Sequence, residues 1–332
     1  MHEHIVSLYH LNDLGPEELH RLLPGHRDTR ITQFAPGADL FGHPDVLASA
    51  TVVLAPLAKE HRVEAELMDA MPRLRHIQAV AVGFDGVDHL AAAERGIPVA
   101  NLPGFNSTAV ADWTMGALLQ LLRRYALGHA TVLRHGWEHE GLRGPDVSSL
   151  TVGVAGFGSI GRQVAHRLDA FGARVLVHDP VPSEPGREYV GLAELCARSD
   201  VLSLHMPLDE GTRGLVGDTL LRSMPRGGYV LNAGRGGVLD EDALVRALDD
   251  GQLAGAALDV FAVEPLPEES PLRGRDDVLL SPHTAGATWG SRHRLRERLV
   301  AQLDRVLSGR PPQDVVNGVR ATARPRNAVG GR

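Results

Sequence analysis

Short apolar runs alternate with longer amphipathic runs along most of the chain. In the first third, apolar runs bounded by turn residues predict buried strands at residues 5–8, 51–55, 77–80 and 98–100. Runs with apolar positions at helical spacing predict helices at 17–23, 63–70 and 89–95. Strands that alternate with helices are typical of a parallel sheet covered by helices, so the pattern predicts an α/β fold.

A second series of the same kind begins at Leu150. Its predicted strands are at 151–155, 174–178, 201–204, 229–232, 254–258 and 278–280, and a last helix is predicted at 289–307. Between the two series, a wide apolar face predicts one long helix over 108–134, suited to connecting domains or contacting another subunit. A chain of 332 residues is too long for one core, so two α/β domains are expected.

Composition and charge argue against several classes of function. The formal net charge is −7 with both signs interspersed, which disfavours a nucleic-acid partner. No apolar run reaches the roughly 18 residues of a membrane helix, and the first residues do not resemble a signal peptide. The single cysteine, Cys196, cannot form an internal disulfide, so a cytoplasmic protein is expected; a core position is commoner for it than a nucleophilic role. No group of His, Cys or carboxylates has metal-ligand spacing.

The motif Gly-Phe-Gly-Ser-Ile-Gly at 156–161 follows a predicted strand and opens a predicted helix. Gly156 permits a tight turn, Gly158 lets a pyrophosphate approach the backbone, and Gly161 lets the helix pack on the strand. Asp179 ends the next strand, where a carboxylate binds ribose hydroxyls and repels a 2′-phosphate. The segment predicts a dinucleotide site that takes NAD and disfavours NADP; a glycine-rich turn for another ligand is the alternative.

Three charged or titratable residues follow successive predicted strands of the second series: Arg235, Glu264 and His283. Open α/β sheets bind ligands at the ends of such strands. A 2-keto acid needs a cation for its carboxylate, a proton donor for its carbonyl oxygen and a group that keeps the donor charged, and Arg, His and Glu fill these roles. Taken singly, each has a plainer explanation as a surface side chain, and only their joint placement predicts a catalytic site.

This order of motifs resembles the D-isomer-specific 2-hydroxyacid dehydrogenases. The resemblance extends to about residue 317, and its matching segments are 82–85, 101–112, 156–161, 204–208, 232–237, 257–265 and 281–286. It implies two Rossmann-like or flavodoxin-like parallel-sheet domains with a cleft between them. The NAD-binding domain would be 102–284, the substrate domain 1–101 plus 285–317, and 318–332 would be a flexible tail.

The resemblance also implies roles for individual residues. Arg235 would bind the substrate's carboxylate and carbonyl oxygens, with backbone N–H groups at Val82 and Gly83 completing the carboxylate site. His283 would be the acid or base, paired with Glu264. The expected cofactor contacts are Gly156, Gly158, Ser159, Ile160, Gly161, Asp179, His205, Pro207, Thr212, Ala233, Gly234, Arg235, Asp259, His283 and Gly286. A homodimer through the 108–134 region is expected.

Departures from related enzymes narrow the substrate. Formate dehydrogenases of this superfamily carry Gln at the position of Glu264, and phosphite dehydrogenases carry Lys at that of Val82, so both substrates are disfavoured. The chain shows no added regulatory domain, which argues against the long phosphoglycerate dehydrogenases. The expected pocket, 54–57 and 82–84, is mostly apolar and favours a small or apolar 2-keto acid. Trp113 is expected to be a core residue, and Trp289 remains open between packing and facing the cleft.

Two rival functions remain. A non-catalytic NAD(H)-sensing scaffold or corepressor on the same fold would keep the same motifs, and turnover of any 2-keto acid would separate it from an enzyme. An S-adenosylmethionine-dependent methyltransferase also carries a glycine-rich turn. Gly161 and the set of Arg235, Glu264 and His283 argue against that second rival.

Overall fold

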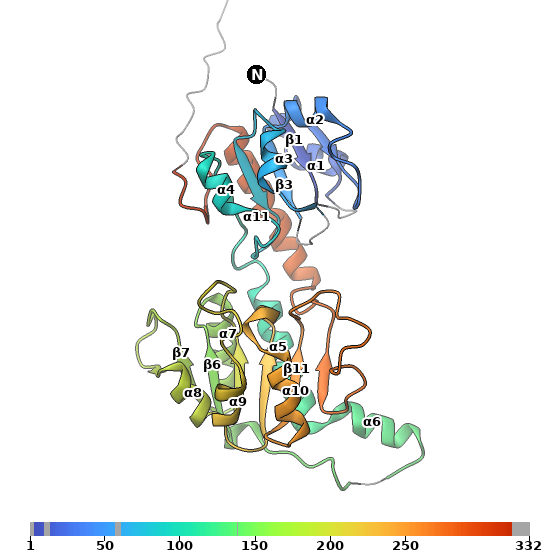
Figure 1. The fold of residues 1–332 in the computed structure, drawn as a ribbon, viewed down its shortest axis with the longest axis vertical. Coiled ribbons are helices and arrows are strands. Elements are labelled where there is room, and N and C mark those ends of the chain that lie inside the picture. Colours follow the sequence, from blue (N-terminus) through green and yellow to red (C-terminus); the bar gives the residue numbers. More distant parts are fainter. Residues whose placement is uncertain (1–2, 10–13, 57–60, 138, 321–332) are drawn as a thin grey trace, which may run out of the picture. The chain divides into compact units, whose positions relative to one another are not determined.

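The computed structural model describes residues 3–9, 14–56, 61–137 and 139–320. Contacts between residues divide it into two compact units (Figure 1). The first is built from residues 1–106 and 289–332, and the second from residues 107–288. Both units have α/β architecture, as the alternation of apolar and amphipathic runs predicts.

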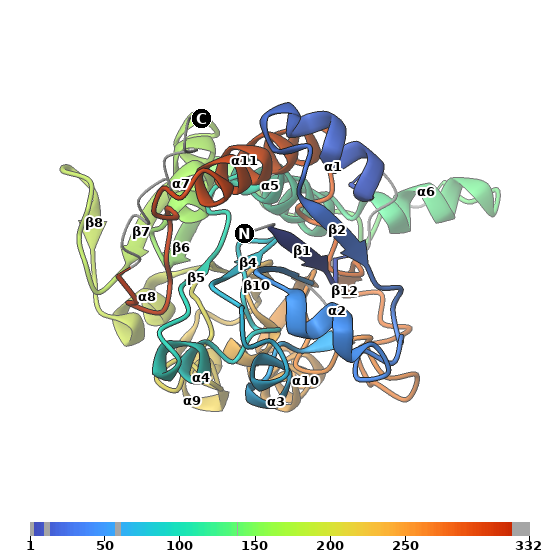
Figure 2. The same ribbon diagram turned by 90° about the horizontal axis from the view of Figure 1, so that it is seen from above.

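The first unit contains a five-stranded parallel sheet in the order β2-β1-β3-β4-β5. Its strands are β1 (His4–Ser7), β2 (Arg30–Gln33), β3 (Val52–Ala55), β4 (His76–Ala79) and β5 (Val99–Ala100). Its helices are α1 (Pro16–Leu22), α2 (Pro44–Ser49), α3 (Ala65–Asp69), α4 (His89–Glu94) and α11 (Trp289–Leu307). In Figure 2, α1 and α11 lie on one side of this sheet and α2, α3 and α4 on the other.

Alternating side chains of each strand supply both cores of this unit. Val6 packs into the cluster with α2, α3 and α4, and its neighbour Ile5 packs into the cluster with α1 and α11. The sequence pattern missed β2 because it is an edge strand whose residues, Arg-Ile-Thr-Gln, are exposed or half-buried. It also missed α2, a helix of six residues that is too short to show a helical period.

The second unit contains a seven-stranded parallel sheet in the order β12-β11-β10-β9-β6-β7-β8. Its strands are β6 (Thr151–Ala155), β7 (Arg174–His178), β8 (Glu188–Tyr189), β9 (Val201–Leu204), β10 (Gly228–Asn232), β11 (Leu253–Leu258) and β12 (Val278–Leu280). Its helices are α5 (Ser107–Arg123), α6 (Tyr125–Leu133), α7 (Ser159–Ala170), α8 (Leu192–Arg198), α9 (Asp218–Ser223) and α10 (Glu241–Asp249). The helices α5 and α7 cover one face, and α8, α9 and α10 cover the other.

The prediction of one continuous helix over 108–134 is wrong. The helix α5 ends at Arg123, Arg124 adopts a left-handed conformation with φ of 47°, and α6 starts at Tyr125. The apolar face of α5 packs on the sheet, whereas every residue of α6 is exposed or half-exposed. A periodic apolar pattern cannot reveal a break at one residue when apolar side chains continue on both sides of it.

Among the described residues, no helix combines the length and the apolar character required to cross a membrane.

Candidate active site

The glycine-rich turn at 156–161 joins β6 to α7 at the carboxyl edge of the second sheet. Gly156 has φ of +92°, and a Cβ there would lie 2.7 Å from the His205 carbonyl carbon. A Cβ on Gly161 would lie 2.0 Å from the Gly156 oxygen, so helix and turn approach too closely for any side chain. At Gly158, by contrast, a Cβ would meet no described atom within 4 Å. Gly156 and Gly161 are therefore required by packing, and Gly158 leaves room for a ligand.

The start of α7 can accept a phosphate. No side chain among the described residues caps this helix at Gly158, so its first N–H groups are left for a ligand. The Ser159 hydroxyl donates to Ser107 Oγ at 2.8 Å, and Ile160 is half-buried against the neighbouring core. An open turn and an uncapped helix N-terminus fit the pyrophosphate of a dinucleotide.

Asp179 stands directly after β7, and its carboxylate braces the turn. Its Oδ2 accepts a hydrogen bond from Phe157 N at 2.7 Å, and its Oδ1 accepts one from Val181 N at 2.9 Å. The sequence analysis assigned Asp179 to the ribose alone, without these two backbone contacts. The carboxylate is thus fixed beside the glycine-rich turn, where its negative charge faces any group bound there.

Glu264 and His283 form a hydrogen-bonded pair. The Glu264 Oε2 and His283 Nδ1 atoms lie 2.9 Å apart, and Glu264 Oε1 accepts from Phe261 N at 3.0 Å. The two residues follow β11 and β12, which are neighbours in the sheet. The hydrogen bond of His283 to Glu264 is the largest cause that raises the pKa of His283; desolvation and the charge of Arg235 act in the opposite direction. The His283 side chain is 47% exposed, so its Nε2 edge is accessible.

Arg235 follows β10, the next strand of the sheet. Its Nη1 donates to the Gly234 carbonyl at 2.8 Å. Asn232 braces the turn through two bonds: its Nδ2 donates to Arg235 O at 3.0 Å, and its Oδ1 accepts from Gly234 N at 3.1 Å. The turn also packs on the β11 loop, because a Cβ on Gly236 would lie 1.9 Å from the Phe261 carbonyl carbon. The structure thus joins the Arg235 turn to the loop that carries Glu264.

Asp259 is 2% exposed and holds the His283 loop. Its Oδ1 accepts from Ser281 Oγ at 2.5 Å and from Thr284 N at 2.7 Å, and its Oδ2 accepts from Ala285 N at 2.8 Å. His283 N donates to the Asp259 carbonyl at 2.8 Å and adopts φ of +53°. The sequence analysis missed Ser281 and Asn232 as braces, since their contacts depend on strand order.

The remaining expected cofactor contacts cluster after β9 and β10. His205 Nε2 lies 2.8 Å from Ser203 Oγ, and its Nδ1 is buried without a hydrogen-bond partner among the described residues. Burial lowers the pKa of His205 to about 4, so its ring is neutral. The Thr212 hydroxyl donates to the Pro207 carbonyl at 2.7 Å. The turn that contains Ala233 lies beside the end of β9, since a Cβ on Gly234 would be 3.2 Å from the Leu204 oxygen. Gly286 belongs to the loop after His283.

The expected substrate-domain residues lie in the first unit. Val82 and Gly83 follow β4, and the Val82 carbonyl accepts from Asn101 Nδ2 at 2.7 Å. Leu54 is buried in β3, and Leu57 falls outside the described residues.

The structure shows the surroundings of Trp113, Trp289 and Cys196. Trp113 is half-buried and packs on the core between α5 and the sheet, so packing accounts for it. Trp289, the first residue of α11, is 90% exposed. Cys196 is buried, which raises the pKa of its thiol to about 11 and suits a core residue rather than a nucleophile.

Comparisons with known proteins show the family of the chain. The family model described as D-isomer specific 2-hydroxyacid dehydrogenase, NAD binding domain, matches residues 115–285. A glyoxylate reductase from Thermofilum pendens is 39% identical over 279 residues, which are 81% of this chain and 82% of that protein.

Solved structures resemble nearly the whole chain. The structure of D-lactate dehydrogenase from Aquifex aeolicus, complexed with NAD and lactic acid, is 29% identical with a TM-score of 0.83 and covers 92% of this chain and 96% of that one. The NADPH-dependent glyoxylate/hydroxypyruvate reductase from Sinorhizobium meliloti, in complex with NADP and malonate, is 30% identical with a TM-score of 0.84; the match covers 98% of this chain and all of that one. The predicted fold class of two parallel-sheet α/β domains is confirmed.

Proposed function

This chain belongs to the D-isomer-specific 2-hydroxyacid dehydrogenase family, and we propose that it interconverts a small 2-keto acid and its D-2-hydroxy acid with NAD(H). The observation that carries the proposal is the Glu264–His283 pair at 2.9 Å, next to Arg235 at the ends of adjacent strands. The glycine-rich turn at the same edge of the sheet fits the dinucleotide. The assignment as an NAD-binding dehydrogenase of 2-hydroxy acids rests on the family, and the roles below are our proposals.

In the reducing direction, His283 gives its proton from Nε2 to the substrate's carbonyl oxygen. Glu264 holds the Nδ1–H of the ring, which keeps the imidazole in one orientation and favours its charged form. Arg235 binds the substrate's carboxylate with its fork of N–H groups and polarises the carbonyl. The chemistry that NADH supplies when bound is hydride delivery to the carbonyl carbon. In the oxidising direction, neutral His283 takes the hydroxyl proton.

We assign cofactor binding to the unit 107–288 and substrate recognition to the unit that contains Val82 and Gly83. The first assignment is supported by the turn at 156–161, and the second by the family resemblance. A small or apolar 2-keto acid is the proposed substrate, because Val82, which belongs to the proposed carboxylate site, is apolar and half-buried. Kinetics in which 3-phosphohydroxypyruvate exceeded glyoxylate, pyruvate and hydroxypyruvate would contradict this choice.

The direct test follows the loss of NADH absorbance as a 2-keto acid is reduced. We expect oxidation of NADH with at least one member of a panel of 2-keto acids. The panel contains glyoxylate, hydroxypyruvate, pyruvate, phenylpyruvate, branched 2-keto acids and 3-phosphohydroxypyruvate. Binding of NADH without turnover across the panel would favour the alternative, an NAD(H)-sensing scaffold.

Asp179 should set the preference for NADH over NADPH. A 2′-phosphate beside its fixed carboxylate would meet a like charge, which we expect to disfavour NADPH. Asp179→Asn should therefore raise the ratio of kcat/KM for NADPH to that for NADH by about tenfold, which corresponds to about 1.4 kcal/mol. The ratio is the useful measurement because a partly misfolded enzyme lowers both values together.

Asp200 offers the matched control for Asp179. Its Oδ2 also accepts from a backbone N–H of β6, that of Thr151, but at the start of the strand, away from the glycine-rich turn. Asp200→Asn should leave the cofactor ratio unchanged. An unchanged ratio in Asp179→Asn as well, or an enzyme that already uses NADPH as well as NADH, would contradict the assigned role.

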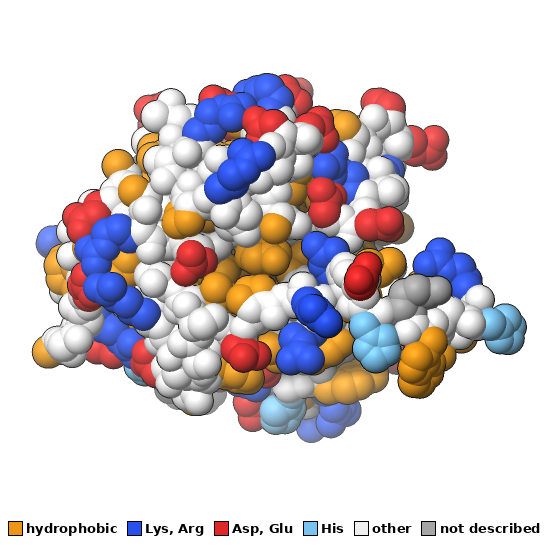
Figure 3. All heavy atoms as spheres, turned by 90° about the horizontal axis from the view of Figure 1, so that it is seen from below, with side chains coloured by type: hydrophobic (Ala, Val, Ile, Leu, Met, Phe, Trp, Pro, Cys, Tyr) orange, Lys and Arg blue, Asp and Glu red, His pale blue; other side chains and the backbone are white. Residues whose placement is uncertain are grey.

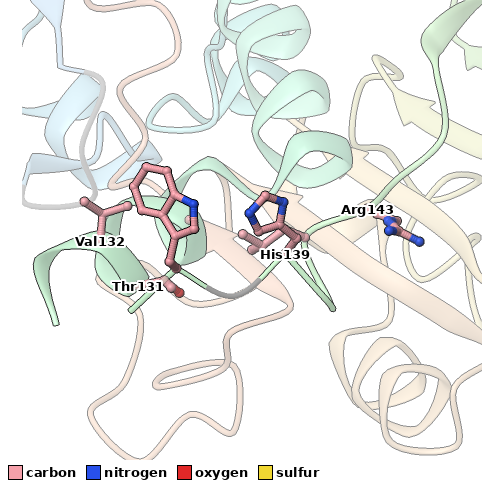
Figure 4. A pocket seen from close by; sticks show the side chains of 7 residues that line it. Thr131, Val132, His139 and Arg143 are labelled. Atoms are coloured by element: carbon pink, nitrogen blue, oxygen red, sulfur yellow. The ribbon is translucent and has the colours of Figure 1, made fainter. Parts of the chain in front are cut away.

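The α6 segment supports a homodimer. Tyr125, Val132, Leu133 and Trp137 are 56%, 55%, 67% and 78% exposed, an unusual set of large apolar side chains in water. Apolar atoms lie open on this projecting segment in the space-filling view (Figure 3). A hollow of about 340 Å³ opens between α6 and the segment that follows it, with Val132 and His139 in its wall (Figure 4).

Leu133→Glu should turn the proposed dimer into a monomer, because a charge would have to be buried in an apolar contact. Size-exclusion chromatography coupled to light scattering measures the mass of the assembly directly. Val181→Glu is the control, since Val181 is 69% exposed on another part of the same unit and should leave the mass unchanged. A wild-type monomer at all concentrations would refute the proposal.

A cytoplasmic location stays a prediction and rests on Cys196, whose buried thiol is compatible with a reducing compartment. Among the described residues there is no group of three His, Cys, Asp or Glu that could hold a metal ion, and the proposed mechanism uses none.

A further inference from the structure

Glu241 is the first residue of α10, and its side chain accepts a hydrogen bond from a loop outside that helix. Its Oε1 accepts a hydrogen bond from Ala262 N at 2.6 Å, in the loop that follows β11. The N-terminus of α10 is capped by a different residue: Asp240 Oδ1 accepts from Ala243 N at 3.0 Å. Glu241 is therefore not needed as the helix cap, and its carboxylate serves the neighbouring loop.

That loop carries Glu264, and two consecutive amides in it are held by two carboxylates. Phe261 N donates to Glu264 Oε1, and Ala262 N donates to Glu241 Oε1. The peptide between Phe261 and Ala262 also packs against Gly236, where a Cβ would lie 1.9 Å from the Phe261 carbonyl carbon and 2.5 Å from Ala262 N. The peptide is thus fixed between the Arg235 turn and the Glu241 carboxylate.

We propose that Glu241 is a positioning residue of the dehydrogenase reaction: by holding Ala262 N it fixes the loop 261–264 and so keeps Glu264 against His283 Nδ1. The inference rests on the proposed function, because it presumes that the Glu264–His283 pair is catalytic. The connection from β10 to α10 then supplies both Arg235, which binds the substrate, and Glu241, which orients the acid–base pair.

The contact with Ala262 favours the charged form of Glu241. Burial and the nearby carboxylates of Asp242 and Glu264 raise the pKa of Glu241, whereas the hydrogen bond from Ala262 N lowers it. The ring of His283 faces Glu264, Asp259 and Arg235. The Ala262 N–H thus stabilises the carboxylate that holds it in place.

Glu241→Ala and Glu241→Gln separate the contact from the charge. Alanine removes the acceptor for Ala262 N, so Glu264 is held less firmly. We expect kcat to fall about tenfold, as small displacements in an active site do, with the KM for NADH changed less than about twofold. Glutamine keeps a carbonyl oxygen in the same place and should restore most of kcat.

The pH profile distinguishes this role from a merely structural one. Glu264 raises the pKa of His283, so a looser Glu264 should let that pKa fall in Glu241→Ala. The pH at which kcat/KM for reduction is half lost should then move to a lower value. In Glu241→Gln it should stay closer to the wild-type value.

Two variants on the same helix serve as controls. Asp240→Ala removes the cap of α10 and should lower the melting temperature while leaving the pH midpoint unchanged. Asp242→Asn removes an exposed charge and should change neither kcat nor the midpoint. Turnover by the wild type together with wild-type kcat and midpoint in Glu241→Ala would overturn this inference alone. An inactive wild type on every 2-keto acid would instead overturn the proposed function.

Discussion

Replacing His283 by alanine should lower kcat for NADH-dependent reduction by about a thousandfold, within the range usual for loss of a general acid. The reason is geometric and electrostatic. The ring is fixed through Nδ1 by Glu264 at 2.9 Å, which leaves Nε2 to give the proton and favours the charged form of the ring. Stopped-flow or steady-state absorbance of NADH measures kcat, and NADH fluorescence measures binding, which should change little.

The wild-type pH profile follows from the same pair. Glu264 raises the pKa of His283, so reduction should be fully active well below that pKa and should fall as pH rises through it. Oxidation of the 2-hydroxy acid needs the neutral ring and should show the opposite dependence. Glu264→Gln should shift the pH midpoints of both reduction and oxidation to lower values, because the anion that favours the charged ring is gone.

His293 provides the control for His283. It lies on α11 with a side chain 72% exposed, so His293→Ala should keep wild-type kcat. Equal activity of His283→Ala and the wild type would remove His283 from the mechanism.

The sequence predicted the site best where the chemistry depends on one short segment. Gly156 and Gly161 could be assigned from the motif alone, because the close approach of helix and turn admits no side chain at either position. Arg235, Glu264 and His283 could be grouped because parallel strands end at one edge of a sheet. Their pairing distances could not be predicted, since they depend on the β10-β11-β12 order and on loops of irregular shape.

The contacts that brace the site were not predictable from a single sequence. Asn232, Ser281 and Glu241 act through hydrogen bonds to loops that are distant in the chain or lie across a tight turn. Asp259 was predicted only as a cofactor contact, and the structure adds that its carboxylate accepts three hydrogen bonds from the His283 loop. Polar side chains of this kind look in the sequence like ordinary loop residues.

Errors in the predicted fold have a similar origin. The strand β8 has two residues, Glu188 and Tyr189, at the edge of its sheet, so it shows no buried apolar run. The break at Arg124 depends on one backbone conformation, which the helical pattern on both sides conceals. The central strands were predicted correctly because burial on both faces gives them continuous apolar sequences.

Replacing Arg235 by alanine should lower kcat/KM for the 2-keto acid by about a hundredfold or more, since its guanidinium is the proposed partner of both the carboxylate and the developing negative charge. Arg235→Lys should recover only part of this loss, because an ammonium cannot make two parallel hydrogen bonds to a carboxylate. Substrate titrations at saturating NADH measure both variants. Free guanidinium ion added to Arg235→Ala should restore part of the rate if the lost group is the planar cation.

Arg213 serves as a control that tells whether kcat/KM depends on the position of the Arg235 side chain or only on positive charge near the site. It is an exposed arginine whose Nη1 would lie 3.7 Å from a Cβ on Gly237, two residues after Arg235. Arg213→Ala removes a nearby positive charge without touching the turn that Asn232 braces, and should leave kcat/KM within about twofold of the wild type. An equal loss in Arg213→Ala and Arg235→Ala would mean that the site attracts its substrate by general charge. Loss confined to Arg235, with rescue by guanidinium, would mean that the braced turn after β10 presents one particular side chain to the substrate.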